Sequence, residues 1–212
     1  MAGLCADRCA AELDHEIEDK VGLRMNQVTN GAINRRLFED NKFDGFCRAY
    51  LKTDDCITEC GNFSHKHILE AKLKHFEYLC KIRHDDFLEA LPCYRNASDK
   101  VETKCDNKCG WPTFARDQLK QLEGFHLRGD QQNALVIMNN ICKHITCYNK
   151  CELPIYYEVC GRDQPGHLIQ DFIHYTFFHG KKTMQQAGLG YLFPNSCNRF
   201  ASATATHYLS LL

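Results

Sequence analysis

Fourteen cysteines in 212 residues constrain this chain more than any other feature of its sequence. Eight of them form four Cys-x-x-x-Cys pairs, namely Cys5/Cys9, Cys56/Cys60, Cys105/Cys109 and Cys147/Cys151. The other six are Cys47, Cys80, Cys93, Cys142, Cys160 and Cys197. An even, high cysteine count is typical of a disulfide framework formed in an oxidising compartment. We therefore expect a secreted, extracellular protein with all its cysteines bonded.

The spacing inside each pair indicates helices that are bonded to other helices. Three intervening residues place two cysteines on the same face of a helix. Their Cβ atoms then point the same way, so each cysteine is expected to bond to a neighbouring helix. Structural zinc sites favour two intervening residues or cysteine pairs followed by histidine pairs. We therefore predict disulfides, no metal and no cofactor; a reduced chain with buried thiols is the remaining alternative.

Apolar residues at helical spacing predict an all-α, disulfide-stapled fold of about six to nine helices. The expected helices cover residues 10–21, 43–60, 65–90, 112–125, 131–151 and 168–179. Pro92 and Gly180 are expected to end two of them, because these residue types commonly follow a helix end. Asp130 is expected to cap the next helix, and the tail from Ala201 is expected to be loose.

The order of the cysteines predicts an internal duplication. Residues 1–104 and 105–212 each contain seven cysteines, with pairs and single cysteines in the same order. Coincidence in a cysteine-dense chain is the alternative to duplication. Because seven is odd, full oxidation requires at least one disulfide between the two helical halves, which are then expected to form one rigid unit. The connectivity cannot be deduced from sequence alone.

Composition argues against two classes of function. Lys and Arg number 26 and Asp and Glu 27, so the chain lacks the basic excess of a nucleic-acid-binding protein. No stretch approaches the ~20 apolar residues of a transmembrane helix. No signal peptide precedes Cys5, so we expect a mature form from which a signal has been removed.

Two N-glycosylation sequons agree with an extracellular location. They are Asn62-Phe63-Ser64 and Asn96-Ala97-Ser98, and both are expected in exposed loops between helical segments. Asn62 and Asn96 are therefore predicted acceptors. Chance occurrence of a common tripeptide is the alternative.

Two further stretches are candidate binding sites. Arg128-Gly129-Asp130 is an integrin-type tripeptide, although a turn at Gly129 and a helix cap at Asp130 explain it equally well, and we favour this structural role. The second stretch is a basic side of one helix, made by His65, Lys66, His67, Lys72, Lys74 and His75. It would attract acidic glycans, more tightly below pH ~6.5 where histidines charge. A solvated helix face is the alternative.

The chain carries none of the common catalytic motifs. Gly-x-Ser-x-Gly, His-Glu-x-x-His and the Cys-Cys-x-x-His-Asp helix of secreted phospholipases are absent. The triplet His84-Asp85-Asp86 is interpreted as the polar side of an amphipathic helix. We therefore predict that the protein is not an enzyme.

Several stretches resemble a known family. They are Phe46-Cys47-Arg48-Ala49-Tyr50 with Cys56-Ile57-Thr58-Glu59-Cys60, Tyr78-Leu79-Cys80, and Ile141-Cys142 with Cys147-Tyr148-Asn149-Lys150-Cys151. Their cysteine rhythm, from Cys47 to Cys197, resembles secreted cysteine-rich helical domains of nematodes, of the chondroitin proteoglycan four type. The resemblance implies an extracellular, glycosylated, non-enzymatic protein. Chondroitin is carried on Ser-Gly sites, however, and this sequence contains no Ser-Gly. The spacing is also distantly similar to helical ligand-binding domains of growth-factor receptors, which implies a protein partner.

We expect a secreted protein that binds an extracellular protein or an acidic matrix glycan through a rigid helical surface, which its bridges preorganise. A structural component of matrix or of an eggshell-like layer is the first alternative. An intermembrane-space protein with paired Cys-x-x-x-Cys helices is the second, and the two sequons argue against it. The sequence makes no prediction about the oligomeric state.

Overall fold

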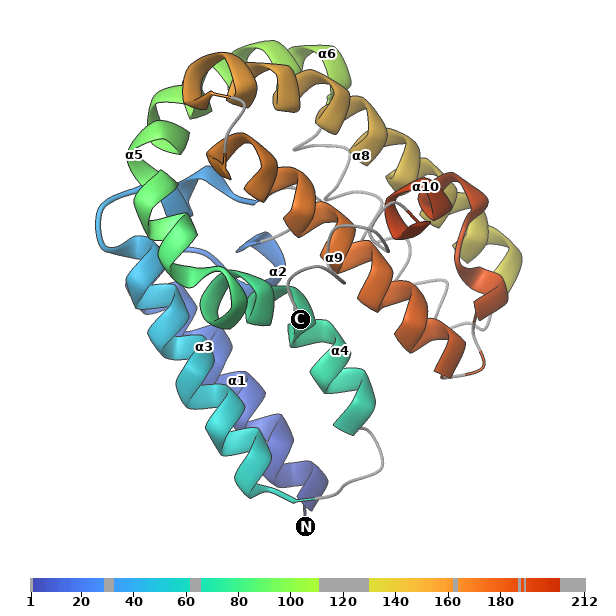
Figure 1. Cartoon of the computed structure of the whole chain (residues 1–212). Coiled ribbons are helices and arrows are strands. Elements are labelled where there is room, and N and C mark those ends of the chain that lie inside the picture. Colours follow the sequence, from blue (N-terminus) through green and yellow to red (C-terminus); the bar gives the residue numbers. More distant parts are fainter. Residues whose placement is uncertain are drawn as a thin grey trace. The chain divides into compact units, whose positions relative to one another are not determined.

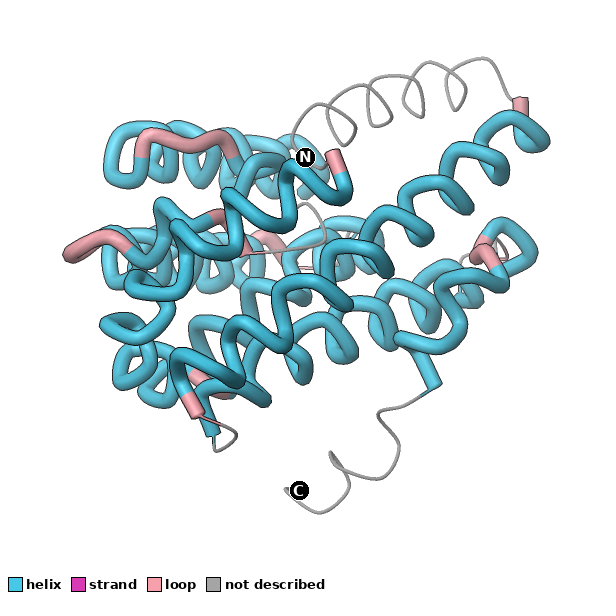
Figure 2. The backbone as a smooth tube through the Cα atoms, turned by 90° about the horizontal axis from the view of Figure 1, so that it is seen from above, coloured by secondary structure: helices cyan, strands magenta, loops and turns pink. Residues whose placement is uncertain are grey.

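A computed structural model describes residues 2–28, 33–61, 66–110, 130–161, 164–186, 188 and 190–202. The described residues are mostly helical and include no strand, as the tube in Figure 2 shows. The chain divides into two compact units, Met1–Arg95 (unit 1) and Asn96–Leu212 (unit 2). The predicted all-α, disulfide-stapled fold is confirmed.

Unit 1 is built on two long antiparallel helices, α1 (Ala2–Val21) and α3 (Lys42–Glu59), which lie side by side in Figure 1. Buried residues recur along α1 at intervals of three and four, at Ala6, Cys9, Leu13, Ile17 and Val21. This spacing places them on one helix face, which packs on α3. Short helices α2 (Met25–Val28) and η1 (Arg35–Phe38) lie between the two in sequence.

An aromatic core completes unit 1. It lies among α3, α4 (Lys66–Glu77), the π-helical turn η2 (Tyr78–Ile82) and the first part of α5 (His84–Val101). Its fully buried rings are Phe38, Phe43, Phe46, Phe76, Tyr78, Phe87 and Tyr94. The rings of Phe46 and Phe76 meet edge to face with centroids 4.9 Å apart. The Cys47–Cys80 disulfide, with Cα atoms 5.1 Å apart, ties α3 to η2 beside this core.

Unit 2 packs α8 (Gln131–Cys160) against α9 (Gln164–Gln186). The π-helical turn η3 (Glu102–Asp106) and α6 (Asn107–Cys109) lie against α8, and η4 (Gly190–Leu192), η5 (Asn195–Cys197) and α10 (Asn198–Ser202) follow α9. The Cys142–Cys197 disulfide ties α8 to η5, with Cα atoms 5.3 Å apart. His174 Nδ1 on α9 lies 2.8 Å from the Phe200 carbonyl oxygen on α10.

The Cys-x-x-x-Cys pairs bond to each other in the same way in both units. Cys5 bonds to Cys60 and Cys9 to Cys56, with Cα atoms 5.8 and 6.0 Å apart. In unit 2, Cys105 bonds to Cys151 and Cys109 to Cys147, at 5.6 and 5.9 Å. In each case the first cysteine of one pair meets the last of the other, so the joined helices run antiparallel. We call these the unit 1 ladder and the unit 2 ladder.

Two predicted helix ends are wrong. α5 continues through Pro92 to Val101, and α9 continues through Gly180 to Gln186. Pro92 is exposed, so the Leu88 carbonyl oxygen that loses its helical partner can be hydrated instead. A helical glycine costs only about 1 kcal/mol relative to alanine, which the packing of α9 on α8 offsets.

The predicted helix at residues 65–90 is also wrong as a single element. α4 ends at Glu77, η2 follows, and Arg83 leaves the helical region with φ −128° before α5 begins at His84. The helix predicted from residue 131 is confirmed and is longer than expected, because it passes an exposed proline, Pro154, and ends at Cys160. The loose tail predicted from Ala201 is wrong for its first two residues, because Ala201 and Ser202 belong to α10 and Ala201 is buried. The rest of that tail and the helix predicted at 112–125 lie outside the described residues.

Candidate functional site

One hollow of unit 1 is a cleft between α1 and α3, which we call the acidic cleft. Its volume is ≈ 300 Å³, and it is lined by Cys9, Glu12, Glu16, Lys52, Thr53, Asp55, Cys56 and Glu59. Cys9, Glu12 and Glu16 fall at helical spacing on α1, and the α3 residues fall within two turns of one another, so each helix supplies one wall. The unit 1 ladder fixes the separation of the two walls at one end.

Glu16 and Lys52 join the two walls of the acidic cleft. Lys52 Nζ on α3 donates to Glu16 Oε1 on α1 at 2.5 Å, and Lys20 Nζ donates to Glu16 Oε2 at 2.8 Å. These two hydrogen bonds hold the pKa of Glu16 below its usual value. Hydrogen bonding to Glu16 likewise raises the pKa of Lys52. Glu16 is therefore ionised at neutral pH.

The lining of the acidic cleft is net negative, although Arg8 pairs with Glu12 at 3.9 Å and Lys20 pairs with Glu16 from outside the lining. Four carboxylates line it, on Glu12, Glu16, Asp55 and Glu59, against the single ammonium of Lys52. A cleft lined mainly by one sign of charge focuses its field outward. A field of this sign favours basic ligands over acidic ones.

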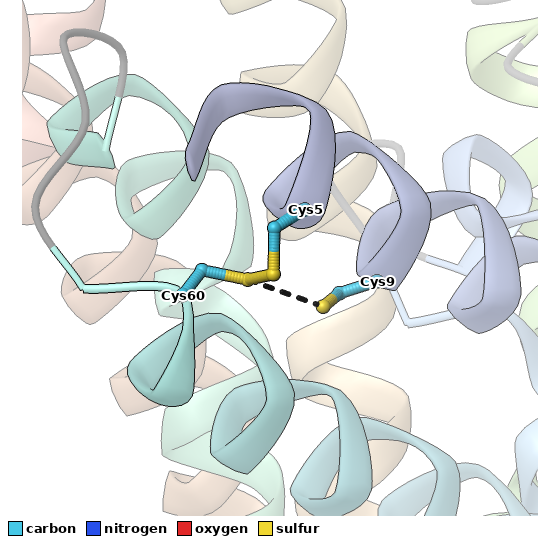
Figure 3. Close-up of side chains that lie close together, drawn as sticks. All are labelled: Cys5, Cys9 and Cys60. Carbon is cyan, nitrogen blue, oxygen red and sulfur yellow. Dashed lines mark hydrogen bonds between the residues drawn. A yellow bond between two sulfur atoms is a disulfide. The ribbon is translucent and has the colours of Figure 1, made fainter. Parts of the chain in front are cut away.

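Three sulfur atoms cluster at the unit 1 ladder, and of these three residues Cys9 also lines the acidic cleft. Cys5, Cys9 and Cys60 lie together in the close-up of Figure 3, and their sulfur atoms all fall within 4.8 Å of one another. Cys9 Sγ lies 3.7 Å from Cys60 Sγ, although each is bonded to a different partner. Metals are held by thiolates, and disulfide sulfurs cannot supply them. In the oxidised protein this cluster is therefore a pair of bridges rather than a metal centre.

Comparison with known proteins assigns the chain to a family. The family described as "Uncharacterized protein B0403.3" matches residues 5–210, nearly the whole chain. The chain belongs to this family. No curated protein and no solved structure matches it. The B0403.3 match carries no reference to chondroitin proteoglycans.

Of the predicted basic side of one helix, the side chains of Lys74 and His75 are described in this B0403.3 family member. Lys74 forms an ion pair with Glu77. The ring of His75 packs on that of Phe76, with centroids 4.0 Å apart, and burial lowers the pKa of His75 to about 4. His75 is therefore neutral between pH 5.5 and 7.5, contrary to the expected charging. His65 and the side chains of Lys66, His67 and Lys72 lie outside the described residues.

The carboxylate of the Arg128-Gly129-Asp130 tripeptide caps a helix. The Asn133 backbone N–H donates to Asp130 Oδ1 at 3.2 Å, and Asn133 Nδ2 donates to Oδ2 at 2.7 Å. Asp130 thus satisfies the first turn of α8, as the structural interpretation of the sequence predicts. Arg128 and Gly129 lie outside the described residues.

Asn96 is exposed, but it lies within α5 rather than in a loop. The predicted loop setting of this sequon is therefore wrong, because α5 continues beyond Pro92. Asn62 lies outside the described residues. Among the described helices of this family member, none combines the length and apolar character that a membrane span requires.

A second hollow of unit 1, of ≈ 460 Å³, surrounds the junction of η2 and α5. There His84 Nδ1 lies 3.0 Å from Asp85 Oδ1, and His84 Nε2 lies 3.6 Å from Asp44 Oδ1. The lining residues include no hydroxyl, and their cysteine, Cys80, is bonded to Cys47. The arrangement therefore holds a histidine between two carboxylates.

Unit 2 buries two polar side chains on the inner face of α8. Asn149 is 5% exposed and Glu152 is 2% exposed, and neither Asn149 Oδ1 nor Glu152 Oε1 has a hydrogen-bond partner among the described residues. Burial, with a smaller contribution from the Asp106 carboxylate, raises the pKa of Glu152 to about 8. Glu152 is therefore largely protonated at neutral pH.

The sequence reasoning missed both the acidic cleft and buried Glu152. A usable signal for the cleft was present, since Glu12, Glu16, Asp55 and Glu59 recur at helical spacing beside Cys9 and Cys56. Recognising it required knowing that these two helices bond to each other. No comparable signal marks Glu152, because a glutamate inside a helix is usually exposed.

Proposed function

We propose that this chain is a secreted, non-enzymatic protein that binds a basic segment of an extracellular protein in the acidic cleft. The observation that carries the proposal is the cleft itself, in which four carboxylates and one lysine line a hollow between two helices joined by two disulfides. Because the bridges fix the walls before binding, little conformational entropy is lost when a partner enters.

Charge favours a protein over an acidic glycan as the partner. The acidic cleft favours basic ligands over anionic polymers, and the described part of the basic side has Lys74 in an ion pair and His75 neutral. Lysine and arginine side chains of a partner would meet Glu12, Asp55 and Glu59 at the mouth. Such pairs contribute mainly to association rate and specificity.

An intermembrane-space protein remains a second candidate, because one observation favours it. Both ladders join two Cys-x-x-x-Cys pairs into a helical hairpin, which is the arrangement that this alternative expects. The two candidates differ in glycosylation. An N-glycan on the native protein would eliminate the intermembrane-space candidate.

The test uses the full oxidised chain as bait in extracellular fluid of its source, with quantitative mass spectrometry of retained proteins. Glu59→Lys reverses a charge in the acidic cleft, and Asp19→Lys makes the same change on exposed α1 surface outside it. We expect a protein with a Lys/Arg-rich segment to be retained by the wild type and by Asp19→Lys. Glu59→Lys should lower its affinity about tenfold, equivalent to about 1.4 kcal/mol.

A synthetic peptide of the retained protein's basic segment and a heparin oligosaccharide then serve as direct probes. The peptide should bind the wild type and lose affinity to Glu59→Lys. Equal peptide affinity for both charge variants would overturn the cleft as the binding site. Binding of heparin in place of the peptide would overturn the choice of partner.

A further inference from the structure

The unit 1 ladder brings two sulfurs of different disulfides into contact. Cys9 Sγ, bonded to Cys56, lies 3.7 Å from Cys60 Sγ, bonded to Cys5. Figure 3 shows the Cys5–Cys60 bridge beside the Cys9 sulfur, with the contact dashed. This separation is close to the sum of two sulfur radii, so no atom lies between them. A thiolate at Cys60 would need no large movement to reach Cys9.

Burial differs among the four cysteines of this ladder. Cys9 is 1% exposed, whereas Cys5, Cys56 and Cys60 are each partly exposed. A small thiol can therefore reach the Cys5–Cys60 bridge more readily than the sulfur of Cys9. Cys60 Sγ also lies 3.2 Å from the Cys56 carbonyl oxygen, which would accept the proton of a Cys60 thiol and keep its sulfur against α3.

We propose that the unit 1 ladder is a thiol–disulfide exchange site in which Cys60 attacks Cys9 and releases Cys56. First, a small extracellular thiol attacks Cys5 Sγ, forms a mixed disulfide with Cys5 and releases Cys60 as a thiolate. The Cys60 thiolate then attacks Cys9 Sγ. A Cys9–Cys60 bond forms, the Cys9–Cys56 bond breaks, and Cys56 leaves as a thiolate that takes up a proton. The second step transfers no net electrons.

The unit 2 ladder provides a comparison within the same molecule. It has the same pairing, Cys105–Cys151 and Cys109–Cys147, and all four of its cysteines are described. Within the described residues, no sulfur contact of this kind joins Cys109 to Cys151, the pair that corresponds to Cys9 and Cys60. Exchange is therefore specific to unit 1.

The exchange would change the acidic cleft. Cys9 and Cys56 both line it, so transfer of the bond from Cys56 to Cys60 removes one rung and leaves a thiol in the wall. The exchange chemistry does not depend on the proposed binding function. The effect of exchange on the acidic cleft is the one part of this inference that rests on the proposed binding function.

The decisive experiment compares Cys5→Ser with Cys105→Ser. Each variant is secreted, purified, held at pH 8, quenched in acid, alkylated at low pH and mapped by non-reducing peptide analysis. In Cys5→Ser, we expect a mixture in which Cys60 is alkylated in some molecules and Cys56 in others, the latter with a Cys9–Cys60 bond. In Cys105→Ser, we expect alkylation at Cys151 alone. The Cys56-alkylated fraction should form more slowly at pH 6, because the thiolate is the attacking species.

A second measurement, on the wild-type protein, tests the proposal even if the Cys5→Ser variant does not fold. Native wild-type protein is treated with substoichiometric glutathione at pH 8 and mapped in the same way. We expect glutathione on Cys5, a Cys9–Cys60 bond and a free Cys56. Alkylation of Cys60 alone in Cys5→Ser, or a retained Cys9–Cys56 bond in every wild-type molecule that carries glutathione on Cys5, would overturn the proposal. If the basic peptide fails to bind wild-type protein in which no exchange has occurred, that result contradicts the proposed binding function and not the exchange.

Discussion

Glu16 on α1 accepts a hydrogen bond from Lys52 on α3, with 2.5 Å between Glu16 Oε1 and Lys52 Nζ. The two residues lie 36 positions apart in sequence, and they meet because the unit 1 ladder pairs these helices antiparallel. Lys20 holds the other oxygen of the same carboxylate. Two lysines thus offset the charge of Glu16, which is one of the four carboxylates that line the acidic cleft.

Glu16→Gln tests how much this pairing stabilises unit 1. The pKa of Glu16 is lowered in the folded chain, so its contribution is present above the ordinary value of 4.5 and is lost as pH falls through the folded pKa. At pH 7 we expect the variant to lose about 0.5–1 kcal/mol, since both lysines are solvent-accessible. The difference should shrink as pH falls below 4.5 and vanish once Glu16 is protonated in the folded chain. Urea unfolding with disulfides intact measures it, and Glu18→Gln, exposed on the same helix, should change stability less.

Glu152→Gln should stabilise unit 2, increasingly so with rising pH. The pKa of Glu152 is raised from 4.5 to about 8, so between these values the folded chain binds a proton that the unfolded chain has lost. Wild-type stability therefore falls across that window, by about 1.4 kcal/mol per pH unit. The neutral amide removes this slope.

The measurement for Glu152 is the pH dependence of the free energy of unfolding in urea between pH 4.5 and 8. We expect the gap between Glu152→Gln and the wild type to grow by roughly 4 kcal/mol over the window. A destabilisation by the buried amide that does not depend on pH would change the free energy of unfolding of Glu152→Gln equally at pH 4.5 and at pH 8. It would therefore leave the pH dependence of the gap unchanged. Glu158→Gln, exposed on the same helix, is the control and should show no such slope. Parallel profiles for Glu152→Gln and the wild type would contradict a protonated Glu152.

Local patterns in the sequence were sufficient for the fold class. The Cys-x-x-x-Cys spacing places both sulfurs on one helix face, and this geometry correctly predicts bonding between helices rather than within one. The Asp130 cap was also predictable, because it depends only on residues within one turn. Helix ends at Pro92 and Gly180 were not, because tertiary packing and exposure of the proline outweigh a local preference.

The candidate site depends on pairings that sequence does not reveal. The acidic cleft exists only because Cys5 bonds to Cys60 and Cys9 to Cys56, one of a very large number of possible connectivities. The lowered pKa of His75 likewise depends on its burial in the folded chain, which helical spacing does not reveal. The basic helix face predicted from helical spacing therefore included His75, which is neutral at physiological pH.

Asn96 is predicted to carry an N-glycan when the chain is produced in a secretory pathway. Its side chain is exposed on α5, so a glycan can project without displacing core residues. Intact mass before and after enzymatic deglycosylation measures occupancy. Asn96→Gln and Ser98→Ala should each remove the same glycan mass, because both destroy the sequon. Identical masses for the wild type and both variants would contradict glycosylation at this site.

The cysteine count predicts at least one disulfide between residues 1–104 and 105–212. All fourteen cysteines are bonded, and three described bridges in each half account for six of its seven. Cys93 and Cys160 are the bonded cysteines outside these six bridges. Counting therefore predicts that the bridge between the halves joins Cys93 to Cys160. Such a bridge would restrict the unfolded chain and add about 2–4 kcal/mol of stability.

Intact mass and non-reducing peptide mapping of secreted protein test this count. Full oxidation predicts a mass fourteen hydrogens below that of the reduced chain, and mapping should recover one Cys93–Cys160 peptide. Cys93→Ala with Cys160→Ala should remove the bridge and lower the unfolding midpoint while keeping the chain monomeric under non-reducing conditions. A disulfide-linked dimer of the wild type that resolves on reduction would contradict the count, because it would place these two sulfurs in bonds between chains.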